Sequence, residues 1–129
     1  MTDKKLYIKE RDTLFEIMKS GNTEEVIRWY DENATLYDEQ FNSCGFVYHL
    51  TTVETVCKVA PDKKAVILDV GAGSGVIGKL LRDHGYCTID AVDASEGMLK
   101  IAGQKNIYRS LICAKIGTEL IQEETCEYL

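Results

Sequence analysis

Apolar residues recur at helical spacing through the first 60 residues, with polar residues between them. Apolar residues three and four apart predict a helix over residues 4–20. A second helix is expected from Asn22, and a third over 50–60 is stopped by Pro61, the only proline. The polar, glycine-containing stretch at 38–49 is expected to be irregular.

The pattern changes in the second half of the chain, where short apolar runs alternate with helical stripes. Strands are predicted at 65–70, 88–92 and 107–114, and the first of them is typical of a strand buried on both faces. Strand–helix alternation gives parallel pairing with right-handed crossovers. The sequence therefore predicts an α/β fold in two parts, an N-terminal helical cap over 1–60 and a parallel sheet with its helices over 61–129.

Composition narrows the classes of function. The 129 residues carry 15 Lys and Arg against 21 Asp and Glu, a net charge of −6. This acidic balance, without a basic run, argues against binding nucleic acid through its phosphates. Apolar runs are too short for a membrane span, and the charged start differs from a secretory signal. The five scattered cysteines lack metal-ligand spacing, so we expect reduced thiols, a cytoplasmic location and no metal site.

A glycine cluster follows the first predicted strand and precedes a helix. The segment Gly71-Ala72-Gly73-Ser74-Gly75 lets the main chain turn sharply and lets a ligand approach the backbone. Asp93 ends the second strand, and Ser95 can cap the helix after it. Ligands of parallel sheets bind outside the carboxyl ends of the strands. An acid at that place can accept the hydroxyl groups of a ribose, so a cofactor that contains a nucleoside is expected.

The glycines fit two classes of cofactor. The segment 73–78 has the GxGxxG pattern of dinucleotide-binding enzymes, with Asp93 further along the chain. In that frame the strand does not end directly before the first glycine. In the frame that starts at Gly71 the sixth position is Val76, and Asp69 stands two residues before GxGxG. The second frame fits the sequence better.

Two motifs in order resemble those of class I S-adenosylmethionine-dependent methyltransferases. Leu68–Gly75 is similar to their first motif and Val92–Leu99 to their second. The segment Trp29–Glu39, with its Tyr-Asp repeat, resembles a narrower group, the methyltransferase-like proteins named after the Williams–Beuren syndrome chromosomal region. The resemblance runs from about Trp29 to the C-terminus. It implies S-adenosylmethionine as cofactor and a Rossmann-like half-domain with about three parallel strands in the order 3-2-1.

The resemblance also implies which residues bind the cofactor. The backbone of Gly71, Ala72 and Gly73 would run under its methionine part, and Asp69 would face its amino group directly or through water. Asp93 would hold the ribose hydroxyls. The remaining residues would border the adenine or close over the cofactor from the N-terminal helices: Ala94 and Met98, and Tyr30 and Tyr37. Packing in the core explains Met98 and the two tyrosines equally well.

No catalytic residue is predicted, since methyl transfer from the sulfonium needs mainly proximity and alignment. His84 stands at a helix end and is expected to be a capping or solvated residue. His49 is placed in a loop near the expected entrance to the site. The methyl acceptor stays open, because acceptor contacts usually come from the other half of the superfamily fold.

The sequence departs from the superfamily in two ways. The stretch 113–117 lacks the acid that many members place after the third strand. The superfamily sheet has seven strands in the order 3-2-1-4-5-7-6, and this chain stops at Leu129, where the fourth strand would begin. We therefore expect a truncated sheet in which strand 65–70 lies at an edge and favours self-association.

A chain of this kind is not expected to transfer methyl groups by itself. Two other functions stay open at this point. One is a non-catalytic cofactor-binding or interaction protein. The other, with less support, is an NAD-dependent oxidoreductase, which only the shifted GxGxxG favours.

Overall fold

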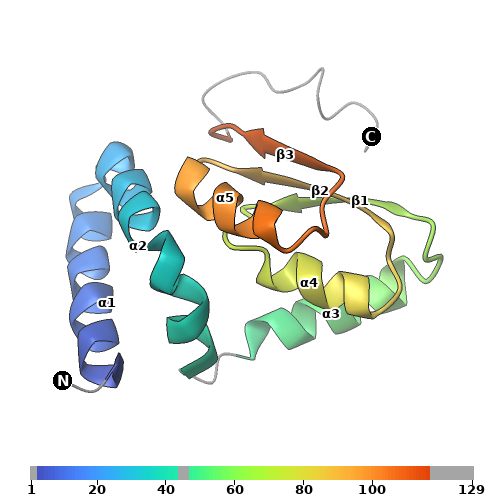
Figure 1. Ribbon diagram of the computed structural model, residues 1–129, viewed down its shortest axis with the longest axis horizontal. Coiled ribbons are helices and arrows are strands. Elements are labelled where there is room, and N and C mark those ends of the chain that lie inside the picture. Colours follow the sequence, from blue (N-terminus) through green and yellow to red (C-terminus); the bar gives the residue numbers. More distant parts are fainter. Residues whose placement is uncertain (1–2, 44–46, 117–129) are drawn as a thin grey trace.

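A parallel sheet of three strands, in the order β1-β2-β3, carries the second half of the described chain (Figure 1). The computed structural model describes residues 3–43 and 47–116. The strands are β1 (Val66–Val70), β2 (Thr88–Asp93) and β3 (Ser110–Cys113). In the register of the sheet, Ile67 lies opposite Ile89 and Ala91 opposite Leu111. The predicted α/β class, strand number and strand order are confirmed.

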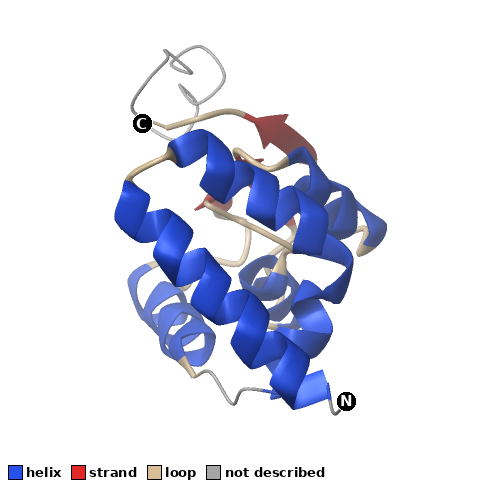
Figure 2. Cartoon of the chain, turned by 90° about the vertical axis from the view of Figure 1, so that its left-hand side faces the viewer, coloured by secondary structure: helices blue, strands red, loops and turns tan. Residues whose placement is uncertain are grey.

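The described helices cover one face of this sheet and extend beyond it. They are α1 (Asp3–Ser20), α2 (Thr23–Ser43), α3 (Tyr48–Val59), α4 (Val76–Asp83) and α5 (Glu96–Gln104). Helices α4 and α5 are the crossovers between successive strands and lie below the sheet in Figure 1, as α3 does. Figure 2 shows α1 and α2 side by side. No helix in the described part of the chain combines the length and apolar character needed to cross a membrane.

The core lies between α3, α4 and the sheet. Val53, Leu81, Tyr86 and Ile89 form one buried cluster. The Tyr86 hydroxyl donates a hydrogen bond of 2.7 Å to the carbonyl of Ala60, so this large ring is buried with its polar end satisfied. The cluster thereby fixes the end of α3 against the sheet.

Helix α2 is longer than its sequence pattern suggests, and the irregular stretch predicted at 38–49 is wrong. Helices α2 and α3 take up most of that stretch. Asn33 does not break α2, because its Nδ2 donates a hydrogen bond of 2.8 Å to the carbonyl of Trp29 one turn earlier. Side-chain contacts with the glycine loop, given below, hold the second half of the helix in place.

The expectation that the first strand is buried on both faces is also wrong. Val66 and Val70 of β1 are 44% and 56% exposed, whereas Ile89, Ala91 and Val92 of β2 are fully buried. The central strand has a neighbour on each side, and β1 lies at the edge of the described sheet. Its apolar composition is therefore not matched by burial.

Strand β3 is shorter than the predicted strand at 107–114. The chain still turns at Asn106, where φ is 54°. The backbone N–H of Arg109 donates to the carbonyl of Ile89 at 2.7 Å, and the Arg109 side chain pairs with the buried Asp90 of β2 at 2.5 Å. Regular pairing with β2 begins only after these contacts.

Candidate functional site

The glycine loop lies between β1 and α4, at the carboxyl ends of the strands. Gly71 and Ala72 both donate their backbone N–H to the carbonyl of Val92, at 2.8 and 3.1 Å, so the loop folds back over the end of β2. Gly73 has left-handed backbone with φ 57°, which a branched side chain rarely adopts. A Cβ built at Gly71 would meet nothing within 4 Å. The main chain there faces open space in which a ligand could lie.

Asp93 ends β2 and connects the glycine loop to α5. Its Oδ2 accepts a hydrogen bond from the N–H of Gly73, and its Oδ1 accepts one from the N–H of Ser95, both at 2.9 Å. Ser95 caps α5 as predicted, because its hydroxyl oxygen accepts from the N–H of Met98 at 3.1 Å. Each carboxylate oxygen has a second lone pair, so the carboxylate can also accept hydroxyl groups. The strand-end acid and the loop therefore face one site.

Asp69 is buried beneath the loop and is 8% exposed. The hydroxyl of Tyr108 donates a hydrogen bond of 2.7 Å to its Oδ2. Burial raises the pKa of Asp69, the bond from Tyr108 opposes this, the charge of Asp93 adds to the rise, and a backbone hydrogen bond from Gly78 opposes it. Burial and the charge of Asp69 raise the pKa of Tyr108, so its hydroxyl stays protonated. Sequence reasoning missed Tyr108, which carries no motif of its own.

Tyr108 explains two glycines at the start of α4. A Cβ at Gly78 would lie 2.2 Å from the Tyr108 hydroxyl oxygen, and a Cβ at Gly75 would lie 3.1 Å from its ring. Gly78 is the residue that completes the GxGxxG pattern at 73–78. Since the Tyr108 side chain requires this glycine, the pattern lends no separate support to a dinucleotide cofactor.

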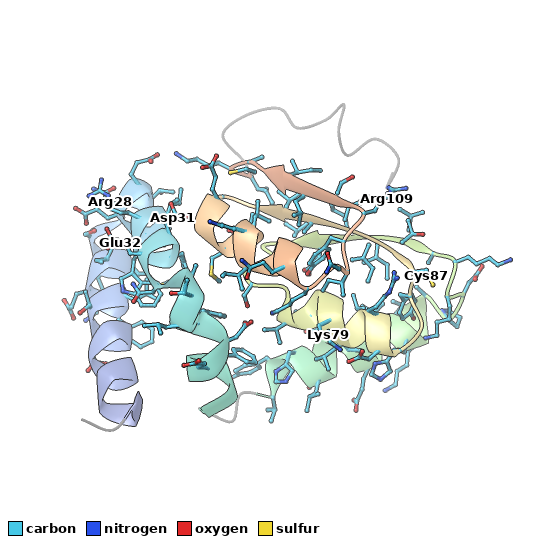
Figure 3. The ribbon with its side chains drawn as sticks, in the orientation of Figure 1. Arg28, Asp31, Glu32, Lys79, Cys87 and Arg109 are labelled. Atoms are coloured by element: carbon cyan, nitrogen blue, oxygen red, sulfur yellow. The ribbon has the colours of Figure 1, made fainter. Side chains whose placement is uncertain are left out.

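Two aspartates of α2, seven positions apart, attach this helix to the site. Asp38 accepts a hydrogen bond of 2.5 Å from the Ser74 hydroxyl and pairs with Lys105 at 2.8 Å. Asp31 accepts from the Ser95 hydroxyl at 2.5 Å and lies on the side of α2 that faces α5 (Figure 3). Sequence reasoning noted the Tyr-Asp repeat but gave its aspartates no role. Their spacing of seven, which returns to the same helix face, is the signal that could have found them.

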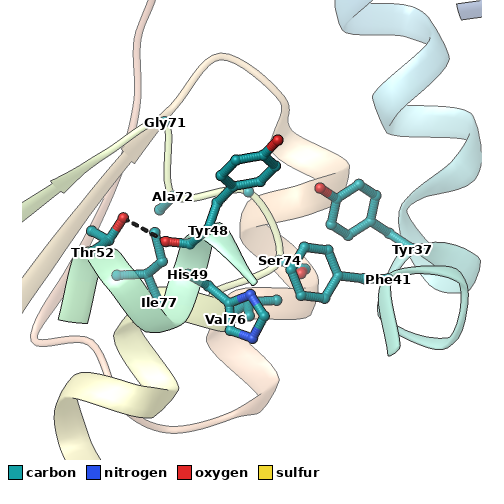
Figure 4. Close-up of a pocket in the computed structure, with 11 residues that line it drawn as sticks. Tyr37, Phe41, Tyr48, His49, Thr52, Gly71, Ala72, Ser74, Val76 and Ile77 are labelled. Carbon is teal, nitrogen blue, oxygen red and sulfur yellow. Dashed lines mark hydrogen bonds between the residues drawn. The ribbon is translucent and has the colours of Figure 1, made fainter. Parts of the chain in front are cut away.

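A cavity of about 310 Å³ lies between the glycine loop, α2 and α3 (Figure 4). Four of the predicted cofactor-binding residues line it: Gly71, Ala72, Gly73 and Tyr37. The other lining residues are Phe41, Tyr48, His49, Thr52, Ser74, Val76 and Ile77. The remaining predicted residues lie outside this lining: Asp69, Asp93, Ala94, Met98 and Tyr30. The structure thus brings the glycine loop and two aromatic side chains of α2, Tyr37 and Phe41, together around one cavity.

Tyr30 lies near Asp93, and Met98 lies against the glycine loop. The rings of Tyr30 and Tyr37 are 6.3 Å apart between centroids. Burial raises the pKa of Tyr30 and the charge of Asp93 raises it further, which places the phenol near this carboxylate. Met98 is 2% exposed, and its Cε lies 3.1 Å from the position of a Cβ built on Gly73. These positions suit the predicted roles and suit packing equally.

The end of β3 places a thiol among carboxylates. The Cys113 thiol donates to the carbonyl of Ala94 at 3.7 Å. Partial desolvation raises the pKa of the exposed Cys113 thiol, and the charges of Glu96, Asp31 and Asp93 raise it further. The stretch after β3 lacks the acid that many superfamily members have, but carboxylates from α2 and α5 lie near the same end of the sheet.

The two histidines have different surroundings. The sequence predicts a loop at His49, but the structure places this residue in the first turn of α3. It lines the cavity, its ring centroid lies 4.9 Å from that of Phe41, and its Nδ1 is buried without a hydrogen-bond partner among the described residues. His84 ends α4, where its Nδ1 lies 2.7 Å from the carbonyl of Leu80. This contact supports the expected capping role of His84.

Comparison with known proteins adds to this geometry. Residues 67–126 match the family described as "Methyltransferase domain". Human methyltransferase-like protein 27 is 30% identical over 95 residues, a match that covers 72% of this chain and 39% of that protein. The chain therefore spans less than half the length of this relative. Among solved structures, the DhpI-SAM-HEP complex aligns with a TM-score of 0.50 and 20% identity, over 67% of this chain and 41% of that chain.

The matched family region begins in β1 and includes the glycine loop, Asp93 and β3. The sequence relative is a methyltransferase-like protein, in agreement with the narrower resemblance. The structural neighbour agrees in fold. The chain therefore carries part of a class I S-adenosylmethionine-dependent methyltransferase domain.

Proposed function

We propose that this chain binds S-adenosylmethionine at the glycine loop, as the cofactor-binding part of a methyltransferase. The observation that carries the proposal is the pair of hydrogen bonds that the Asp93 carboxylate accepts from the backbone N–H groups of Gly73 and Ser95. These bonds place the strand-end acid and the loop at one site. The open space over Gly71 gives a nucleoside with an amino-acid tail room to approach the backbone.

The proposed roles follow the predicted residues. The backbone of Gly71, Ala72 and Gly73 supports the methionine part, and Asp69 attracts its ammonium group. Asp93 accepts from the ribose hydroxyls. Ala94 and Met98 border the adenine, and the rings of Tyr30 and Tyr37 cover the cofactor from α2. The bound cofactor supplies an electrophilic methyl group on a sulfonium. We also propose that the whole protein transfers this methyl group to an acceptor, whose identity the residues of this site do not define.

Calorimetry of the chain with S-adenosylmethionine, S-adenosylhomocysteine and NAD tests the proposal. We expect both adenosyl ligands to bind and NAD not to bind. Asp93→Ala should weaken binding at least about tenfold, because hydrogen bonds to a charged group contribute on the order of 1.5–3 kcal/mol each. Asp83→Ala is the matched control, since Asp83 is an exposed acid that pairs with Lys79 on α4. Tight binding of NAD alone would instead favour an oxidoreductase.

A second candidate function is self-association through β1. In the described part of the chain β1 pairs with β2 alone, and its Val66 and Val70 are exposed. An apolar edge strand with free N–H and C=O groups favours pairing with another strand. A non-catalytic binding or interaction protein would use the same edge.

We also propose a cytoplasmic location. Cys57, Cys87 and Cys113 are free thiols, as expected of a protein in a reducing compartment. Fractionation of cells that express a tagged chain would test this.

A further inference from the structure

We propose that Tyr108 is a positioning residue of the cofactor site, which holds the carboxylate of Asp69 beneath the glycine loop as an ionised acceptor for the cofactor's ammonium group. The inference rests on the proposed function, because it names a new residue for the same site. Tyr108 itself lies between α5 and β3, outside both sequence motifs.

The Tyr108 side chain contacts two elements, the end of β1 and the start of α4. The Tyr108 hydroxyl donates to Oδ2 of Asp69 at 2.7 Å, at the end of β1. Its ring lies against the start of α4, where Gly75 and Gly78 leave out the side chains that would collide with it. A Cβ at Gly78 would be 2.2 Å from the hydroxyl oxygen, which no real Cβ could tolerate. The space for this tyrosine is therefore built into the segment that follows the loop.

The hydrogen bond from Tyr108 opposes the effects that favour protonation of Asp69. Among the described residues, the groups that shift the pKa of this carboxylate are the Tyr108 hydroxyl, the backbone of Gly78 and the carboxylate of Asp93. Burial and Asp93 both raise the pKa of Asp69, and the two hydrogen bonds oppose them. Loss of the Tyr108 hydroxyl would therefore let Asp69 take up a proton at a higher pH. A protonated Asp69 no longer attracts an ammonium group.

The test compares two ligands that differ in this ammonium group. S-adenosylhomocysteine carries it, and 5′-methylthioadenosine lacks the whole amino-acid end. We would measure the affinity of the chain for each by calorimetry from pH 8 to pH 5. In Tyr108→Phe, affinity for S-adenosylhomocysteine should begin to fall at a higher pH than in the native chain. At the acidic end it should be about tenfold weaker, as a pKa difference of roughly one unit implies. Affinity for 5′-methylthioadenosine should stay within about threefold at every pH, since Asp69 does not contact the part that remains.

Tyr86→Phe is the matched control. The Tyr86 hydroxyl also donates a buried hydrogen bond of 2.7 Å, but to the carbonyl of Ala60, away from the loop. Its removal should leave both pH profiles unchanged. Asp69→Asn should abolish the difference between the two ligands in pH dependence, and Tyr108→Phe in that background should add little, as coupled residues require. His49, which lines the cavity, is present in every variant, so its contribution cancels from the comparison.

Equal loss of affinity for both ligands in Tyr108→Phe, independent of pH, would overturn the inference and leave Tyr108 a packing residue. A native chain that binds neither ligand would instead overturn the proposed function, and the inference with it. If Tyr108→Phe fails to fold, 3-fluorotyrosine at position 108 supplies a stronger donor in nearly the same shape. It should move the S-adenosylhomocysteine profile toward lower pH, and an unmoved profile would count against the inference.

Discussion

The backbone N–H of Gly97 donates a hydrogen bond of 2.9 Å to the carboxylate of Asp31, 66 positions earlier in the chain. A Cβ built at Gly97 would lie 2.9 Å from the Cα of Asp31 and 3.0 Å from its carbonyl oxygen. The backbone of α2 therefore contacts the first turn of α5 directly. This contact holds α2, the helix that carries Tyr30 and Tyr37, against α5 beside the proposed cofactor site.

Gly97→Ala should loosen α2 from the site, because backbone has to move to admit the methyl group. We expect a loss of about 1–3 kcal/mol in the free energy of unfolding, the usual cost of overpacking. Gly103→Ala in the same helix is the control. Its Cβ would meet only the end of the Leu111 side chain, at 3.0 Å, which can shift. Urea unfolding measures both variants, and equal effects would show that the contact of α2 with Gly97 contributes nothing.

Gly73→Val should abolish binding of S-adenosylhomocysteine while the helix content stays unchanged. Gly73 has φ 57°, and a Cβ there would lie 3.1 Å from Met98, so a branched side chain must distort the loop beside the cavity. Gly21→Val is the matched control. Gly21 has φ 73° in the turn between α1 and α2, where a Cβ would meet nothing within 4 Å. Calorimetry and circular dichroism compare the two, and intact binding in Gly73→Val would make the loop a turn without a ligand.

The sheet and the site's motifs could be predicted from the sequence because they rest on neighbours in the chain. An apolar run followed by glycines predicts β1 and its loop, and Ser95 caps α5 through the N–H of Met98 three residues on. The parallel pairing follows from the alternation of strands and helices, whereas the order of the strands is implied by the resemblance to the methyltransferase superfamily. Such local signals need no knowledge of what packs against them.

The contacts that complete the site could not be predicted, because they join residues far apart in sequence. Tyr108 reaches Asp69 across 39 positions, and Ser74 reaches Asp38 across 36. The second of these contacts also extends α2 through a stretch that the composition alone suggested was irregular. The exposure of β1 is likewise decided by which strands flank it, and its own composition says nothing about that.

Asp69→Asn should stabilise the fold near pH 7. Burial raises the pKa of Asp69 above its ordinary value, so the folded state holds the proton more strongly than the unfolded state. The stability lost to this shift is therefore zero below the unfolded-state pKa, grows as the pH rises toward the folded-state pKa, and is complete above it. Asparagine keeps an acceptor for the Tyr108 hydroxyl without the charge. The free energy of unfolding of the variant should exceed that of the native chain at pH 7, and the difference should shrink on acidification. A difference that grows on acidification would reverse the sign of the argument.

The exposed edge of β1 predicts that the chain self-associates. Two β1 strands can pair across a twofold axis and join two three-stranded sheets, with Val66 and Val70 covered in the process. The net charge of −6 on each copy opposes this pairing, so association should strengthen as salt screens the repulsion.

Val66→Lys should disrupt the association, since lysine on an edge strand disfavours pairing. Ser110→Lys, at an exposed position on β3 at the other side of the sheet, should not. Sedimentation velocity over a range of protein and salt concentrations measures each species. A native chain that stays monomeric throughout, or equal effects of the two lysines, would show that β1 is not the contact.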